Sequence, residues 1–168
     1  MFDKQTYIER RDALRKMVGS GFILLPGNND SPTNGPYNYY HFRQDSTFLY
    51  FFGQNRDHLA GIIDVDNNCD YLLGDDIEID DIIWYGNVES VSDMAKQVGV
   101  EHSGPFSRVA QMLQEARQGG RKIHFLPPYR HDIQILLHDL LDIHPSLQKG
   151  QASTELIRAV VALRSVKS

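Results

Sequence analysis

Five closely spaced carboxylates in the sequence GDDIEIDDIIWYG are the first candidates for chemistry. They are Asp75, Asp76, Glu78, Asp80 and Asp81. Calcium prefers oxygen ligands at alternate positions of a loop, and Asp76, Glu78 and Asp80 fit positions 1, 3 and 5 of such a loop. The same loop needs a glycine at position 6 and a glutamate at position 12, where this chain has Asp81 and Asn87. We therefore interpret the run as a solvated acidic connector and not as a metal site.

The histidines and the single cysteine would bind a metal only if distant segments met. His131 and His138 fall on the polar face of one predicted helix, so a metal there would need a third ligand from elsewhere. Cys69 is alone and supplies neither a thiolate site nor an intrachain disulfide by itself. The sequence contains none of the motifs H-E-x-x-H, G-x-S-x-G, G-x-G-x-x-G and the P-loop. We predict no metal site and no catalytic site in residues 1–168.

A turn rich in hydrogen-bonding side chains precedes an apolar run. The turn consists of Arg43, Gln44, Asp45 and Ser46. The run, residues 48–52, ends at Gly53. Its aromatic residues favour a strand buried on both faces, although periodicity alone also allows a short buried helix. Arg43 and Asp45 carry opposite charges a short distance apart, which indicates a buried loop held by side-chain hydrogen bonds, with a catalytic role as the alternative.

Three segments resemble motifs of one protein family. Residues 42–53, FRQDSTFLYFFG, resemble the segment YRQDSDFxYLTG in the amino-terminal domain of Xaa-Pro aminopeptidases (aminopeptidase P) of the creatinase/prolidase group. Trp84-Tyr85-Gly86 is similar to the W-x-G element that follows an acidic connector in these enzymes. Residues 162–168, ALRSVKS, resemble the LRxxKS element that joins the amino-terminal domain to the catalytic domain. The resemblance covers essentially the whole chain.

The resemblance implies that residues 1–168 form a single non-catalytic domain, with a catalytic pita-bread domain after it. In the family, two Mn²⁺ ions in the catalytic domain activate water for cleavage of the bond before proline. The aspartates, histidine and glutamates that hold those ions belong to motifs absent from this chain. We therefore expect residues 1–168 to bind no cofactor and to be inactive alone.

Trp84 and Tyr85 are the candidate substrate contacts. In some relatives the matching tryptophan lines the substrate pocket of a neighbouring subunit, and prolyl rings stack well on aromatic faces. The alternative for Trp84 is a core position beneath the acidic connector. The family commonly has an arginine soon after the W-x-G glycine, whereas this chain continues Asn87-Val88-Glu89. The anionic contact that such an arginine would make has no counterpart in residues 87–89.

Composition excludes several other classes of protein. The net charge is −5, from 22 acidic and 17 basic residues, which argues against nucleic-acid binding. No apolar run approaches the roughly 18 residues that span a bilayer, so no membrane partner is expected. The start, MFDKQTYIERR, has no apolar signal-peptide core, and we expect a cytoplasmic protein. A length of 168 residues suits one domain.

The predicted elements alternate between helix and strand. Thr6 and Glu9 are spaced as a capping box that opens a first helix, which Gly19 ends. The predicted strands are residues 22–25, 82–85 and 122–126, together with a hairpin of 59–65 and 69–73. Helices are predicted from Ser90 to the stop at Gly99, from Phe106 to the stop at Gly119, and over residues 129–142 and 154–168. This pattern predicts an α/β fold with a mixed sheet flanked by helices and a possible parallel edge at 122–126. The family implies a similar ribonuclease-H-like sandwich.

We expect the whole protein to be a metallopeptidase that releases the first residue from peptides with proline in second position. The family implies that this domain packs on its own catalytic domain, narrows access to the active site and takes part in homo-oligomer contacts. A prolidase or a creatinase-type parent is the alternative within enzymes. Outside enzymes, the alternative is a stand-alone protein-binding module, as in a eukaryotic histone chaperone with a related domain.

Overall fold

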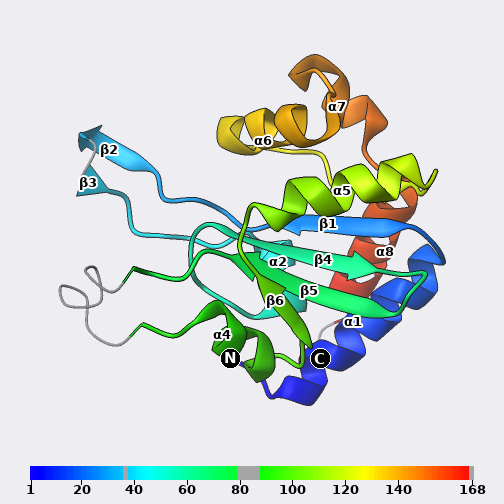
Figure 1. Cartoon of the computed structure of the whole chain (residues 1–168), viewed down its shortest axis with the longest axis horizontal. Coiled ribbons are helices and arrows are strands. Elements are labelled where there is room, and N and C mark those ends of the chain that lie inside the picture. The colour runs from blue at the N-terminus through cyan, green and yellow to red at the C-terminus, as the bar shows by residue number, and fades with distance from the viewer. Residues whose placement is uncertain (36–37, 79–87, 167–168) are drawn as a thin grey trace.

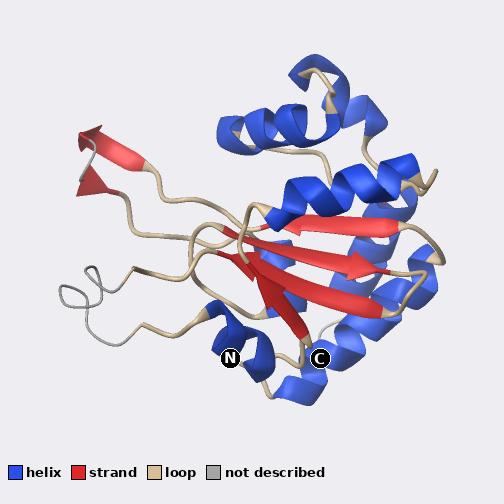
Figure 2. Cartoon of the chain, in the orientation of Figure 1, coloured by secondary structure: helices blue, strands red, loops and turns tan. Residues whose placement is uncertain are grey.

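The fold is built on a five-stranded mixed sheet with helices on both faces (Figures 1 and 2). A computed structural model describes residues 1–35, 38–78 and 88–166. Its strands are β1 (Phe22–Pro26), β4 (Leu59–Asp64), β5 (Cys69–Gly74), β6 (His102–Gly104) and β7 (Ile123–His124), in the order β6-β5-β4-β1-β7. The three central strands pair antiparallel, and β6 and β7 add parallel edges. The predicted fold class and parallel edge are confirmed.

Two apolar clusters lie on opposite faces of the sheet. Successive side chains of a strand point to opposite faces, so Phe22 and Leu24 of β1 join one cluster and Ile23 and Leu25 join the other. The first cluster contains residues of α5 (Arg108–Gln118) and α6 (His131–Leu141). The second contains residues of α1 (Lys4–Val18), α2 (Ser46–Phe52), α4 (Val91–Gln97) and α8 (Thr154–Ser165). Each face of the sheet is therefore covered by its own group of helices.

Residues 48–52, predicted as a strand, form most of helix α2, so that prediction was wrong. Phe48, Phe51 and Phe52 are buried and Leu49 is exposed, which is the spacing of a helix face and not of a strand. Asp45 caps the first turn, and Gly53 ends the helix with φ +64°. The cap residues, and not the apolar run between them, decide the conformation.

Close packing against the sheet holds α2 in place. Gly61 of β4 faces the ring of Phe52, and any Cβ at this position would collide with that ring. The absence of a side chain on Gly61 therefore lets α2 lie directly on the sheet. The carboxyl end of α2 is fixed by Arg11 of α1, whose guanidinium donates to Phe51 O at 2.9 Å and pairs with Asp70 at 2.7 Å.

Other boundaries differ from prediction for local reasons. Asp3 caps α1 in place of the predicted Thr6, because Thr6 N–H donates to Asp3 Oδ1 at 3.1 Å. The paired strands β2 (Pro32–Gly35) and β3 (Asn38–Tyr39) were not predicted. Strand β6 and helix α7 (Pro145–Gln151) were not predicted, since they are too short for periodicity to show. The strand predicted at 82–85 lies outside the described residues.

Candidate functional site

Gln44 connects three loops through a single side-chain amide. Its Oε1 accepts from the N–H groups of Asn28 and Asp45 at 2.8 and 3.0 Å. Its Nε2 donates to the carbonyls of Gln54 and Arg56 at 3.0 and 2.8 Å. The side chain thereby holds the chain after β1, the start of α2 and the segment after α2 in one arrangement. Gln44 makes side-chain hydrogen bonds of the kind expected for this turn, but the turn is not buried as predicted, because Arg43 and Ser46 are exposed.

Asp45 has a structural role and a position at the surface. One carboxylate oxygen accepts from the N–H groups of Thr47 and Phe48 at 3.0 and 2.8 Å, which caps α2. The other accepts from the hydroxyl of Tyr129 at 2.8 Å. Withdrawal of that hydroxyl from water raises the pKa of Tyr129, and its bond to Asp45 raises it further, so the phenol donates at neutral pH.

Arg43 does not pair with Asp45, contrary to the expectation from their opposite charges. The Arg43 side chain is exposed, and its backbone carbonyl accepts from Asn28 Nδ2 at 3.1 Å. Ser46 is exposed at the start of α2. Within the described residues, the motif therefore holds loops together and caps a helix, and no arrangement of nucleophile and base accompanies it.

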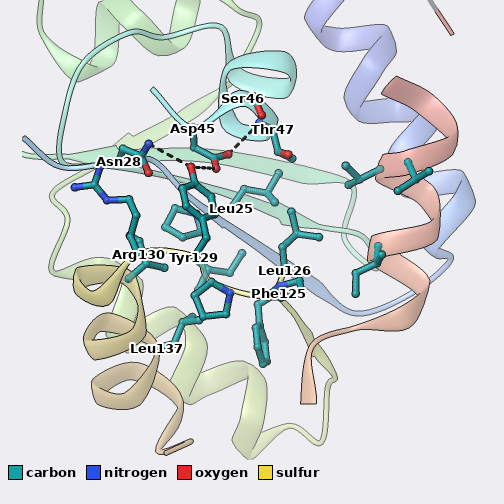
Figure 3. A pocket seen from close by; sticks show the side chains of 18 residues that line it. Leu25, Asn28, Asp45, Ser46, Thr47, Phe125, Leu126, Tyr129, Arg130 and Leu137 are labelled. Carbon is teal, nitrogen blue, oxygen red and sulfur yellow. Dashed lines mark hydrogen bonds between the residues drawn. The ribbon is translucent and has the colours of Figure 1, made fainter. Parts of the chain in front are cut away.

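A cavity of about 280 Å³ opens beside this motif (Figure 3). It lies at the carboxyl ends of β1 and β7, between α2, α6 and α8. Its apolar walls are Leu25, Leu126, Ile133, Leu137, Ile157, Val160 and Val161. Its polar rim contains Asn28, Asp45, Thr47, Tyr129 and Arg130. The cavity is thus apolar inside and polar on the side nearest the start of α2.

Sequence reasoning missed Asn28 and Tyr129 as neighbours of the motif. Asn28 follows β1 and Tyr129 follows the Pro127-Pro128 pair after β7, and the two strands run parallel. Because carboxyl ends of parallel strands meet at one edge of a sheet, polar residues just after each strand were a usable signal. Asn28 Nδ2 lies 3.4 Å from Tyr129 Oη, which connects the two strand ends.

The remaining candidates do not form a reactive centre within the described residues. No three His, Cys, Asp or Glu side chains in that part of the chain lie close enough to hold a metal ion, so it offers no ligand set for manganese. His131 and His138 are exposed on α6. Trp84, Tyr85 and Gly86 lie outside the described residues. No helix in the described ranges is long and apolar enough to cross a membrane.

Solved structures of aminopeptidase P from Escherichia coli are similar to this fold. The low-pH form of E. coli aminopeptidase P has a TM-score of 0.69 and 25% identity, and the match covers 89% of this chain and 34% of that one. The Zn-substituted enzyme in complex with product has a TM-score of 0.70 and 22% identity over the same shares. The complex with the inhibitor Pro-Leu has a TM-score of 0.58 and 24% identity, covering 68% and 27%. The chain spans about a third of the length of the first two.

The family model described as "Aminopeptidase P, N-terminal domain" matches residues 7–124. The chain therefore belongs to the aminopeptidase P N-terminal domain family, and the resemblance found in its sequence is confirmed. No curated protein matches the chain. The E. coli aminopeptidase P of these structures is a hydrolase, and one of the structures holds zinc as a substituted metal.

Proposed function

We propose that this chain is the amino-terminal domain of an Xaa-Pro aminopeptidase, a metallopeptidase that removes the first residue from peptides with proline second. The observation that carries the proposal is the family match over residues 7–124 in a chain that spans 34% of an intact aminopeptidase P. In this proposal the catalytic domain supplies the metal ions, taken to be manganese, and the protein is cytoplasmic. The domain itself shapes access to the active site and contributes to contacts between subunits.

Several features of the described residues support a non-catalytic role for this part of the enzyme. They contain no group of side chains suited to a metal. In the RQDS motif, residues 43–46, Gln44 is engaged in hydrogen bonds between loops and Asp45 caps a helix. A bound metal activates water and polarises the carbonyl before proline, and that chemistry requires ligands from the rest of the enzyme.

The test is an assay of the polypeptide that carries residues 1–168, isolated from its native source. We expect it to release the first residue from a tripeptide with proline second and not from the matched peptide with alanine second. Chelation should abolish the release and Mn²⁺ should restore it. Residues 1–168 alone should release nothing. Activity of residues 1–168 alone, or a native polypeptide inactive on every Xaa-Pro peptide, would contradict the proposal and favour a binding module.

The family resemblance also carries a proposal for Trp84. Its indole is proposed to line a substrate pocket and to stack on the prolyl ring, with Tyr85 beside it. In the intact enzyme, Trp84→Ala should raise KM about tenfold with little change in kcat, since a lost stacking contact of about 1.4 kcal/mol weakens binding tenfold. Trp84→Phe, which keeps an aromatic face, is the control. An unchanged KM in Trp84→Ala would place Trp84 in the core.

A further inference from the structure

The cavity of Figure 3 carries two opposite charges on one side of its rim. Thr47, which lines the cavity, contacts both of them. Its N–H donates to the carboxylate of Asp45 at 3.0 Å, and its hydroxyl oxygen accepts from the guanidinium of Arg164 at 2.9 Å. An anion just before α2 and a cation near the end of α8 therefore lie beside the same residue of the rim.

Neither charge has an oppositely charged partner within the described residues. Asp45 accepts there only from uncharged groups, namely N–H groups of α2 and a tyrosine hydroxyl. Arg164 is exposed and donates to the Thr47 hydroxyl, and in that part of the chain no ion pair joins it to Asp45. The other guanidinium of the rim, on Arg130, is paired with Asp132 at 3.0 Å. Asp45 and Arg164 together therefore complement a ligand that carries both signs of charge.

Asn28 offers a second acceptor beside Asp45. Its side chain lines the cavity and is only 7% exposed. Its amide nitrogen donates to the carbonyl of Arg43 at 3.1 Å, whereas its side-chain carbonyl accepts no hydrogen bond from the described ranges. An ammonium group has three N–H donors and no acceptor. The Asp45 carboxylate and the Asn28 carbonyl would receive two of those donors.

The interior of the cavity suits one aliphatic side chain. Its volume of about 280 Å³ lies just below the roughly 300–1,000 Å³ of clefts that enclose a drug-sized ligand. Aliphatic side chains from β1, α6, α8 and the segment after β7 form its walls: Leu25, Leu126, Ile133, Leu137, Ile157 and Val160. Burial of an apolar group among them removes it from water and stabilises the complex. The cavity therefore fits a small ligand with an aliphatic body and a charged end.

We propose that the cavity binds a free α-amino acid with an aliphatic side chain. The ammonium of the ligand donates to Asp45 and Asn28, its carboxylate pairs with Arg164, and its side chain lies among the apolar walls. An aliphatic acid or an aliphatic amine would satisfy only one of the two charges. The inference goes beyond the proposed function and does not rest on it, because all of these contacts come from residues 1–168.

A photoreactive amino acid tests the site directly. The probe is a leucine analogue with a diazirine in its side chain, which loses N₂ on illumination and inserts into neighbouring bonds. We would label the native polypeptide that carries residues 1–168 and locate the adducts by peptide mass spectrometry. Adducts should form in peptides that cover residues 126–137 and 157–161, which line the cavity. L-Leucine should protect these peptides, and L-aspartate, with its charged side chain, should not.

Two analogues separate the ammonium contact from the carboxylate contact. 4-Methylpentanoate is leucine without its ammonium, and 3-methylbutylamine is leucine without its carboxylate. Half-protection should need at least about tenfold more of either analogue than of L-leucine, since each lacks one charge-assisted contact. Equal protection by 4-methylpentanoate would contradict the contact with Asp45. Equal protection by 3-methylbutylamine would contradict the contact with Arg164.

Asp45→Asn and Arg164→Gln each remove one charge and should keep the fold. Asparagine caps a helix as well as aspartate does, and Arg164 is exposed. Half-maximal labelling of the cavity peptides should need at least about tenfold more probe in each variant. Arg158→Gln, at an exposed position of α8 that does not line the cavity, is the control and should label as the wild type does. Labelling of Asp45→Asn and Arg164→Gln at wild-type probe concentrations would overturn the proposed contacts.

The position of the adducts separates this inference from the proposed function. Adducts that L-leucine displaces only from other parts of the polypeptide would show that the cavity binds no amino acid. Release of the first residue from an Xaa-Pro peptide is measured on the same samples. An active polypeptide without protected adducts in the cavity would overturn this inference alone. An inactive polypeptide with protected adducts there would support the amino-acid site and overturn the proposed function.

Discussion

At the scale of single residues, hydrogen bonds explain the roles of Gln44 and Asp45 in the RQDS motif. Gln44 accepts from two N–H groups and donates to two carbonyls of three segments. Asp45 caps a helix and accepts from the hydroxyl of Tyr129. The sequence predicted that these side chains would hold a loop. It could not identify their partners, because Asn28 and Tyr129 are 16 and 84 residues away from Gln44 and Asp45 respectively.

Gln44→Glu should destabilise the domain by about 2–3 kcal/mol, because the change removes a donor and places an oxygen against the carbonyls of Gln54 and Arg56. Gln114→Glu, on the exposed face of α5, is the control and should change stability by less than about 0.5 kcal/mol. Urea unfolding of both variants measures the difference. Equal stabilities would mean that the Gln44 bonds contribute nothing.

Gly53→Ala should destabilise the domain through backbone strain and through crowding, and Gly120→Ala measures the backbone strain alone. Gly53 and Gly120 have φ of +64° and +72°. A Cβ at Gly53 would collide with the ring of Tyr7, whereas a Cβ at Gly120 would have no atom within 4 Å among the described residues. Gly120→Ala should therefore cost about 1 kcal/mol from backbone strain alone. Gly53→Ala should cost about 1–3 kcal/mol more from crowding. Matching losses in the two variants, measured by thermal unfolding, would contradict the packing described for α2.

At the scale of elements, long periodic segments were predictable and short ones were not. The hairpin of β4 and β5 was predicted because two apolar runs flank an Asp-Asn-Asn turn. The strand predicted at 48–52 failed because five apolar residues fit either a strand or one turn and a half of helix. Asp45 before the run and Gly53 after it were the signals that favoured a helix.

His124 connects three elements and should make their stability depend on pH. Its imidazole contacts Ser153 Oγ, the cap of α8, at 2.6 Å and Ser20 O, after α1, at 2.8 Å. Burial lowers the pKa of His124, so the folded state binds its proton at a lower pH than the unfolded state does. This contribution is complete above the unfolded pKa of about 6.5 and is lost as pH falls below it.

Urea midpoints between pH 7.5 and 5 measure that loss. The His124→Gln variant should show a flatter decline over this range than the wild type, and the exposed His138→Gln should decline as the wild type does. The charge of Lys122 also lowers the pKa of His124, whereas the charges of Glu155 and Asp66 raise it. The lowered pKa of Glu155, about 2, places its own titration below this range. Parallel declines in wild type and His124→Gln would show that His124 is not the responsible group.

At the scale of the whole molecule, the sequence pointed to the family and the fold class, and the structure added the cavity of Figure 3. Periodicity could not find that cavity, because it is assembled from the ends of β1 and β7 and the flank of α8. An apolar cavity that opens at the surface is understandable if the domain works inside a larger enzyme. The matched E. coli structures, of whose chain the match covers 34%, agree with that view.

The most direct test of that view is the intact mass of the native polypeptide that carries residues 1–168. We predict a mass well above the 19.2 kDa of these residues, with the additional sequence following Ser168 and containing the metal ligands. A native mass of 19.2 kDa would contradict the account, because the domain would then act alone and function as a binding module.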